Sequence, residues 1–300
     1  MPCRRISAED NHARRRVNVR DSEMSYVTAG SGDPIVFLHG NPASSYLWRN
    51  VIPHVSDLGW CIAPDLVGMG QSGASPSRAY RFLDHARYLD AWFEALDLRR
   101  NVTLVLHNWG SALGFHWASR HPERVSAIAY MESMVQPREW EDLPPSRAPI
   151  FRDLRSQKGE RMILDENTFI EILLPKLIIR SLTRTEMDAY RLPFIEPESR
   201  WPTLVWPREL PIAGEPAEVV KIFENYGQWL LRSPLPKLFI NADPGSLLIG
   251  RSRDFCRSWP NQQEVTVRGI HFIQEDSPHE IGSALARFVR QTRPASANLM

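Results

Sequence analysis

One short segment, residues 104–115, constrains the fold of this chain more than any other. It reads LVLHNWGSALGF, an apolar run that ends at His107 and is followed by small residues that open a helix near Gly110. An apolar strand that passes directly into a helix requires a sharp turn, and such a turn presents one side chain at the edge of a sheet. Asn108 occupies that position. A neutral carboxamide is a poor nucleophile compared with an ionised Asp, Ser or Cys, so the residue type conflicts with the chemistry that the turn favours.

Strand and helix patterns alternate on both sides of this segment. Apolar strands are predicted at residues 34–39, 61–65, 102–107, 125–131, 237–241 and 264–267. Helices are predicted at residues 82–96, 111–120 and 217–231, and a last helix is predicted to begin at a cap formed by residues 277–280. This alternation is typical of an α/β fold with a mostly parallel central sheet flanked by helices.

Residues 135–215 interrupt the alternation. They are rich in Pro and in helix starts and contain no convincing strand, and Thr183 and Glu186 form a capping-box pattern. We therefore predict a helical cap domain inserted into a core of residues 21–134 and 216–292. Ligands of open α/β sheets bind at the carboxyl ends of the strands, so the cap is expected to lie there.

Both ends of the chain are predicted to be flexible. Residues 1–20 contain six arginines, interrupted by Glu9 and Asp10, and no apolar segment follows, which argues against a signal peptide. We expect a flexible basic tail at residues 1–20, a frayed end at residues 293–300, and a cytoplasmic protein.

Charge and cysteine content exclude several classes of protein. The formal net charge of +1 argues against nucleic acid as the main partner, and no apolar window is long enough to span a membrane. Cys3, Cys61 and Cys256 are too few and too scattered for a disulfide framework or a metal site. Cys61 and Cys256 lie in apolar runs and are expected to be buried thiols. A monomer or a weak homo-oligomer is expected.

Polar residues follow the predicted strands at the points where ligands would bind. Asn41 follows the first strand, Asn108 and Trp109 form the turn, and later strand ends carry the residues Glu132, Asp243 and His271. A nucleophile position, an acid and a base in this order are the arrangement of α/β hydrolases. His271 lies between the last strand and the last helix, which favours a catalytic base over a core histidine. Glu132 is favoured as its supporting acid, and Asp243 stays open as the alternative because its Asp-Pro-Gly context is also a plain turn.

Six segments, taken in order, resemble the haloalkane dehalogenases, in particular the branch that also contains the sea-pansy coelenterazine luciferase. They are residues 39–50, 63–72, 107–117, 131–132, 210–216 and 269–276. The resemblance implies an α/β-hydrolase core with a helical cap, no cofactor and no metal. It also implies that water cleaves a carbon–halogen bond, with a small apolar halogenated substrate and a halide ion as the binding partners.

The resemblance assigns roles to individual positions. The family's nucleophile, an Asp, falls on Asn108, its base on His271 and its supporting acid on Glu132. Its halide-binding donors fall on Trp109 and Asn41, whose backbone N–H groups would also hold an oxyanion. The residues that resemble the apolar lining of the substrate pocket are Phe151, Phe169, Leu173, Trp206, Pro207, Leu210, Leu247 and Phe272.

Asn108 departs from the pattern of this family. An Asp there would displace halide to form an alkyl ester, which His271 would hydrolyse with an activated water; an Asn lacks the anionic oxygen for the first step. Three interpretations follow: an Asp replaced by Asn to trap substrate, an inactive homologue that binds an apolar ligand, or a luciferase-like monooxygenase that uses the same pocket. Trp109 rather than Gly follows Asn108, so fast deamidation is not expected.

Overall fold

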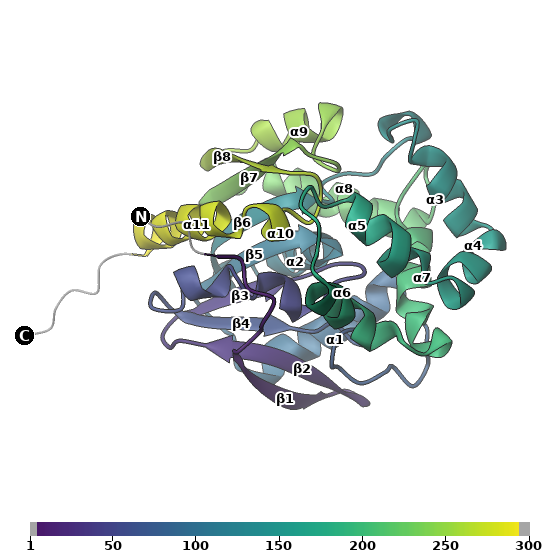
Figure 1. Ribbon diagram of the computed structural model, residues 1–300. Coiled ribbons are helices and arrows are strands. Elements are labelled where there is room, and N and C mark those ends of the chain that lie inside the picture. The colour runs from purple at the N-terminus through teal and green to yellow at the C-terminus, as the bar shows by residue number, and fades with distance from the viewer. Residues whose placement is uncertain (1–4, 294–300) are drawn as a thin grey trace, which may run out of the picture.

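An eight-stranded sheet runs through the centre of the molecule in residues 5–293, the part of the chain that the computed structural model describes (Figure 1). The strands are β1 (Ala13–Val19), β2 (Ser22–Ala29), β3 (Pro34–Leu38), β4 (Trp60–Pro64), β5 (Val102–Asn108), β6 (Val125–Ser133), β7 (Lys237–Pro244) and β8 (Gln262–Gly269). Their order is β1-β2-β4-β3-β5-β6-β7-β8. β2 is antiparallel to β1 and β4, and every other pair is parallel. The predicted α/β fold with a mostly parallel sheet is confirmed.

The helices divide between the core and the cap. The core contains α1 (Phe82–Ala95), α2 (Trp109–Arg120), α8 (Ala217–Leu230), α9 (Gly250–Arg257), α10 (Ile273–Asp276) and α11 (Pro278–Thr292), with the 3-10 turns η1 (Ser45–Trp48), η2 (Ile52–His54) and η3 (Pro122–Arg124). The cap contains η4 (Trp140–Asp142), α3 (Ala148–Arg155), α4 (Lys158–Glu160), η5 (Arg161–Asp165), η6 (Phe169–Leu173), α5 (Leu174–Lys176), α6 (Arg184–Arg191), η7 (Leu192–Phe194), η8 (Pro197–Arg200) and α7 (Trp201–Glu209).

The central strands are covered on both faces, which explains why they are apolar without alternation. Every residue of β5 is buried. Leu104 and Leu106 join a cluster with α1, α2 and α8, whereas Val105 points to the other face and packs with α11. On the first face, Trp117 of α2 stacks on Phe93 of α1 with ring centroids 3.8 Å apart. The two layers hold β5, and with it the turn at Asn108, in a fixed position.

The cap helices lie together beside the sheet, at the right of Figure 1. They have a small core of their own around Leu154, Ile163 and Leu204. The predicted capping box is formed, since the Thr183 hydroxyl accepts from Glu186 N and the Glu186 carboxylate accepts from Thr183 N. No strand is formed within residues 135–215, as expected for a helical insertion.

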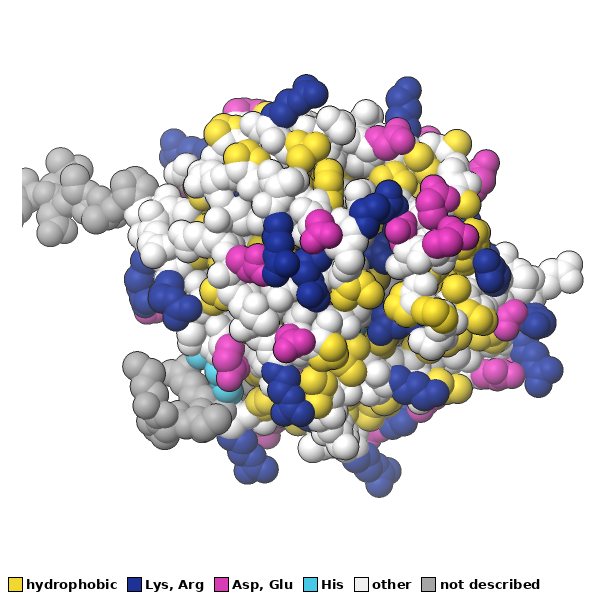
Figure 2. All heavy atoms as spheres, turned by 90° about the horizontal axis from the view of Figure 1, so that it is seen from above, with side chains coloured by type: hydrophobic (Ala, Val, Ile, Leu, Met, Phe, Trp, Pro, Cys, Tyr) yellow, Lys and Arg dark blue, Asp and Glu magenta, His cyan; other side chains and the backbone are white. Residues whose placement is uncertain are grey.

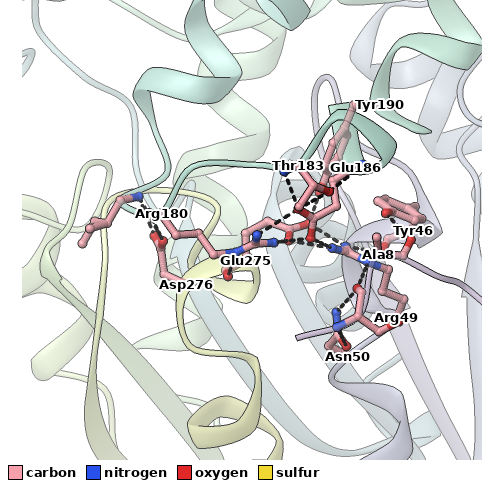
Figure 3. A network of polar contacts seen from close by, with 12 residues as sticks. Ala8, Tyr46, Arg49, Asn50, Arg180, Thr183, Glu186, Tyr190, Glu275 and Asp276 are labelled. Atoms are coloured by element: carbon pink, nitrogen blue, oxygen red, sulfur yellow. Dashed lines mark hydrogen bonds and ion pairs between the residues drawn. The ribbon is translucent and has the colours of Figure 1, made fainter. Parts of the chain in front are cut away.

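Four charged side chains tie the cap to the core (Figure 3). Arg49, just after η1, reaches Glu275 of α10 at 2.6 Å and Glu186 of α6 at 2.9 Å. Arg180, at the base of the cap, reaches Glu186 at 2.6 Å and Glu275 at 2.5 Å. Arg49, Glu186 and Glu275 are buried. Because α10 begins two residues after His271, this ion network also fixes the segment that carries His271.

Further contacts extend the ion network to the backbone on both sides. The Asp276 carboxylate accepts from the backbone N–H groups of Ile179 and Arg180 (Figure 3). On the core side, Arg49 Nε donates to Ser7 O at 2.8 Å, and the hydroxyl of Tyr46 donates to Ala8 O at 2.6 Å. The N-terminal segment, the core and the cap therefore share one polar junction.

The prediction of a flexible tail over residues 1–20 is wrong for the strand β1. Residues 13–19 pair with β2 along their whole length. The strand lies at the edge of the sheet, where most of its side chains face solvent, so arginines replace the apolar residues that would have revealed it. Arg14 also forms an ion pair with the buried Asp65 at 2.8 Å. Residues 1–4, which include Cys3, and residues 294–300 lie outside the described part of the chain.

The predicted helix cap at Ser277 is not formed, whereas the predicted burial of two cysteines is confirmed. Ser277 does not cap the last helix through its side chain; its hydroxyl donates to Arg268 O at 2.8 Å instead. Cys61 and Cys256 are buried free thiols, as expected. Burial raises the pKa of Cys61 to about 12, so this thiol is inert near neutral pH.

The surface shown in Figure 2 carries basic and acidic side chains side by side, without a broad patch of one sign. Within the described residues, no helix is long and apolar enough to cross a membrane. No group of three or more His, Cys, Asp or Glu side chains in the same residues is arranged to hold a metal ion.

Candidate active site

The turn between β5 and α2 holds Asn108 in a conformation that few residues adopt. Its φ of 51° and ψ of −129° lie outside the regions of regular strands and helices. Two glycines make room for this turn. A Cβ on Gly40 would meet Asn108 Oδ1 at 2.2 Å, and a Cβ on Gly110 would meet Leu38 O at 2.3 Å. The close packing of β3 against the turn therefore explains both glycines and presents the Asn108 side chain at the end of the sheet.

The carboxamide of Asn108 is held at both ends. Its Oδ1 accepts from Asn41 N at 3.1 Å and from Trp109 N at 2.7 Å. Its Nδ2 lies 2.8 Å from Nε2 of His271. Because both neighbours of Oδ1 are donors, the amide orientation is fixed, and Nδ2–H donates to His271. Nε2 of His271 is therefore the unprotonated ring nitrogen.

The other ring nitrogen of His271 faces Glu132. His271 Nδ1–H donates to Glu132 Oε2 at 3.0 Å. The buried Glu132 carboxylate also accepts from the backbone N–H groups of Ser246 at 3.1 Å, Leu247 at 2.8 Å and Leu248 at 3.4 Å. Asp243, the alternative acid, is exposed and pairs in the sheet with Arg268. The structure thus places Glu132, and not Asp243, against His271.

His107 supports this arrangement from beneath, although its sequence context indicated only a strand end. Its Nε2–H donates to the backbone carbonyl of His271 at 2.9 Å. Burial, reinforced by the neighbouring His271, holds the pKa of His107 well below its usual range, so the ring stays neutral. Sequence reasoning missed His107 because a histidine at the end of a buried strand gives no sign of its tertiary partner.

Asn41 and Trp109, the predicted halide donors, flank the turn and line the same cavity as Asn108. Within the described residues, Oδ1 of Asn41 is buried without a partner, and Nδ2 makes one long bond, 3.4 Å, to Thr203 O. Trp109 uses its backbone N–H on Asn108, and its indole N–H has no protein acceptor in this part of the chain. Both residues thus have polar groups that a ligand in the cavity could use.

A cavity of about 400 Å³ lies between the strand ends and the cap. Most of the predicted apolar lining is present, namely Phe151, Phe169, Leu173, Pro207, Leu210, Leu247 and Phe272. Trp206 is the exception. It is fully buried behind the wall, where its indole stacks on Trp109 with ring centroids 4.5 Å apart. Its helical position within the cap did not distinguish a ring that lines the cavity from one that supports a lining residue.

The cavity also contains polar residues that the sequence analysis did not identify. Arg138, Arg147, Lys176, Ser146 and Ser246 all contribute to the lining. Charged residues in a helical insertion are normally solvated, so their sequence positions did not distinguish them from surface side chains.

A sheet of this order, with an elbow residue, a histidine and a carboxylate placed by successive strand ends, defines an α/β hydrolase. A family model described as the alpha/beta hydrolase fold matches residues 33–169. The haloalkane dehalogenase of Sphingobium indicum is 57% identical over 284 residues, which are 93% of this chain and 96% of that protein. The haloalkane dehalogenase of Mycolicibacterium smegmatis is 52% identical over 92% of this chain and 90% of its own length.

Solved structures agree with this assignment. The crystal structure of a haloalkane dehalogenase from Bradyrhizobium elkani superposes with a TM-score of 0.90 at 42% identity, covering 94% of this chain and 99% of that one. The chain belongs to the haloalkane dehalogenase family, and the expected family and fold are confirmed.

Proposed function

We propose that this protein is a haloalkane dehalogenase by architecture that binds halogenated alkanes and halide but lacks the nucleophile of the first covalent step. One observation carries the proposal: the Asn108 carboxamide lies at the centre of an otherwise complete set of partners, bound by Asn41 N, Trp109 N and His271 Nε2. The expected cytoplasmic location and oligomeric state stay predictions.

The missing step is displacement of the halide. A carboxylate at residue 108 would attack the carbon that bears the halogen and form an alkyl ester as the halide leaves. In Asn108 the nitrogen lone pair is delocalised into the carbonyl, and its N–H donates to His271, so neither amide atom offers the charge that the displacement requires. We therefore expect substrate to bind without reacting.

The second step would use residues that line the same cavity. Water activated by Nε2 of His271 would attack the ester carbonyl, and the backbone N–H groups of Asn41 and Trp109 would hold the oxyanion that forms. Glu132 holds the Nδ1–H tautomer of His271 and would stabilise the imidazolium. For the halide, the indole N–H of Trp109 and Nδ2 of Asn41 are the available donors.

The decisive experiment is the substitution Asn108→Asp. We expect this variant to release bromide and acid from terminally brominated alkanes. Loss of a nucleophile typically lowers the rate by a factor on the order of 10⁴ to 10⁶, so the unmodified chain is expected to be slower than the variant by about this factor. Asn101→Asp makes the same chemical change at an exposed position and serves as the matched control.

Intact-mass measurement belongs with this assay. Any fraction of the unmodified protein that carries a carboxylate at residue 108 is expected to be active, so its bromide release must scale with that fraction. If folded Asn108→Asp protein releases bromide no faster than buffer, the proposed chemistry is wrong. Substrate binding without turnover in that variant would favour the second candidate, a ligand-binding homologue. No contact in the described site favours the luciferase-like alternative.

A further inference from the structure

The cavity carries positive charge that the dehalogenation of a plain alkane does not require. Arg138, Arg147 and Lys176 line it, and no Asp or Glu stands among its lining residues in the described chain. Arg138 follows β6 and is 4% exposed, and Arg147 precedes α3 and is partly buried. Burying a cationic side chain costs solvation free energy, so a cavity for purely apolar molecules gains nothing from these residues.

Neither guanidinium is neutralised by an ion pair within residues 5–293. Arg138 Nη2 donates to Leu247 O at 2.6 Å, and Arg147 Nη1 donates to the Ser246 hydroxyl. A guanidinium has five N–H donors, so each retains donors for a ligand. Burial lowers the pKa of Arg138 and of Arg147, and the nearby Glu132 opposes that shift. The Glu132 carboxylate is occupied by His271 and by backbone N–H groups, and thus leaves the arginines without a direct partner.

Asn41 and Arg138 follow strands on opposite sides of β5, the strand that ends at Asn108. In the sheet, β3 and β5 are followed by β6 and β7. Asn41 follows β3 and Trp109 follows β5, whereas Arg138 follows β6, and the loop after β7 provides the acceptors for both arginines. A molecule that directs its halogen toward Asn41 and Trp109 would direct its other end toward the arginines.

We propose that this cavity takes halogenated aliphatic molecules that carry a carboxylate at the end remote from the halogen, and that Arg147 and Arg138 bind this carboxylate. The proposal rests on the proposed function, because it assigns a substrate class to the same site. A planar guanidinium matches a carboxylate with two parallel hydrogen bonds, which a neutral alkane cannot accept.

The test compares an ω-bromocarboxylate with the ω-bromoalcohol of the same chain length, in a series of lengths, with the Asn108→Asp protein. Their ratio of kcat/KM is the readout. Charge-assisted hydrogen bonds of about 1.5–3 kcal/mol correspond to a preference of roughly 10- to 100-fold for the carboxylate. We expect Arg147→Met to lower that ratio by about tenfold or more, and Arg147→Lys to retain part of it.

Arg152→Met is the matched control. Arg152 lies on α3, close to Arg147 in sequence, but it is exposed and stacks over the Trp140 ring at 4.7 Å outside the cavity. This variant removes a charge of the same sign from a position five residues further along the chain, so it separates direct binding from long-range electrostatics. The ratio is expected to stay near that of the parent protein.

Calorimetric titration of the unmodified chain with the same two molecules provides a second readout that needs no turnover. A carboxylate preference that Arg147→Met removes would support the proposal even if Asn108→Asp were inactive, in which case only the proposed function fails. A third outcome is that the bromoalcohol is turned over, the carboxylate is not preferred, and Arg147→Met does not change the ratio of kcat/KM. The proposed carboxylate site would then be wrong, whereas the proposed dehalogenase function would stand. If Arg147→Met instead weakens bromide binding and leaves the ratio unchanged, the arginines serve the released halide, which also overturns the proposal.

Discussion

Nδ2 of Asn108 lies 2.8 Å from Nε2 of His271, so an amide donor occupies the lone pair that a catalytic base needs. The contact satisfies both side chains, and His271 Nδ1–H remains on Glu132. Asn108 therefore does more than remove an anionic oxygen, because it also engages the base. A carboxylate at this position would accept rather than donate, and His271 would then be free to change its protonation state during turnover.

His271 is expected to act only in the second covalent step. In an Asn108→Asp background, His271→Phe keeps an aromatic ring of similar size but removes the base, so the alkyl ester should form and persist. Bromide release should stop at about one equivalent, the amount expected when the base is lost, and peptide mapping should locate the alkyl group on residue 108. Multiple turnovers would show that His271 is not the base, and an adduct on Cys61 or Cys256 would show that the reacting position has been misassigned.

Halide binding is expected to survive in the unmodified chain, because Trp109 and Asn41 do not depend on a carboxylate at residue 108. Trp109→Leu should weaken bromide and iodide binding, since it removes the indole N–H from the cavity. Trp140→Leu, outside the cavity lining, is the control. The chain has ten tryptophans, so calorimetry or halide-soaked crystals are better readouts than fluorescence. Halide found only at surface positions would contradict this assignment.

The His85 side chain is expected to lower the free energy of unfolding of the protein. Both of its ring nitrogens are buried without a protein partner in the described chain, and the ring stacks on Trp206 with centroids 4.1 Å apart. His85→Phe should raise the free energy of unfolding by about 1 kcal/mol, because the unpaired polar atoms are removed and the stacking is kept. Urea unfolding at neutral pH measures this difference. A destabilised variant would reveal a polar partner such as a buried water.

His85 should also make the protein sensitive to acid. Burial, with the neighbouring His39, lowers the pKa of His85 from 6.5 to about 3. Below pH 6.5 the His85 ring binds a proton in the unfolded chain, whereas in the folded protein it is protonated only near pH 3. Stability should therefore fall as the pH drops through this interval. His85→Phe should reduce the slope there, and an unchanged slope would mean that the histidine is protonated in the fold.

The ion network between cap and core is expected to be costly to break. Arg49→Met would remove the buried pair with Glu275 at 2.6 Å and leave the partly exposed Arg180 as the remaining cation. Breaking a buried ion pair typically costs about 3–5 kcal/mol of the free energy of unfolding. Arg120 forms a partly exposed pair with Asp90 at 2.7 Å, so Arg120→Met should cost only about 0–1 kcal/mol. Urea unfolding measures the loss of unfolding free energy in each variant. Equal losses would show that Arg49 contributes no more to stability than a surface ion pair does.

Acid should weaken the same network through Glu186. Burial opposes its ionisation, but the hydrogen bonds from Arg180 and from Thr183 outweigh burial and lower the pKa of Glu186 to about 2. The ionised Glu186 carboxylate therefore stabilises the fold fully at pH values above its ordinary pKa of 4.5. This stabilisation is lost as the pH falls toward about 2. Glu186→Gln should flatten the dependence of the unfolding midpoint on pH in this interval. If the unfolding midpoint depends on pH equally in the Glu186→Gln variant and in the unmodified protein, groups other than Glu186 cause the acid sensitivity.

The N-terminal region and Trp206 are two places where the structure differs from the sequence-based prediction. The sequence does not reveal the strand β1, because most of its side chains face solvent and an edge strand of this kind needs no apolar run. Pairing with β2 along its whole length orders the strand. The resemblance to the family assigns Trp206 to the lining of the cavity. Only the packing of Trp109 against Trp206 shows that it lies one layer behind.

The sequence by itself determined the elements that local patterns encode: the alternating strands and helices, the helical insertion, the turn at Asn108, and the order in which Asn108, Glu132 and His271 follow their strands. Parallel strands bring these residues to one edge of the sheet, so their assembly could be predicted without coordinates. The tertiary structure alone decided that Glu132 rather than Asp243 contacts His271, that His107 supports it, and that Arg138 and Arg147 face the cavity. These are contacts between residues far apart in the chain, and they depend on side-chain direction and burial, which no local pattern records.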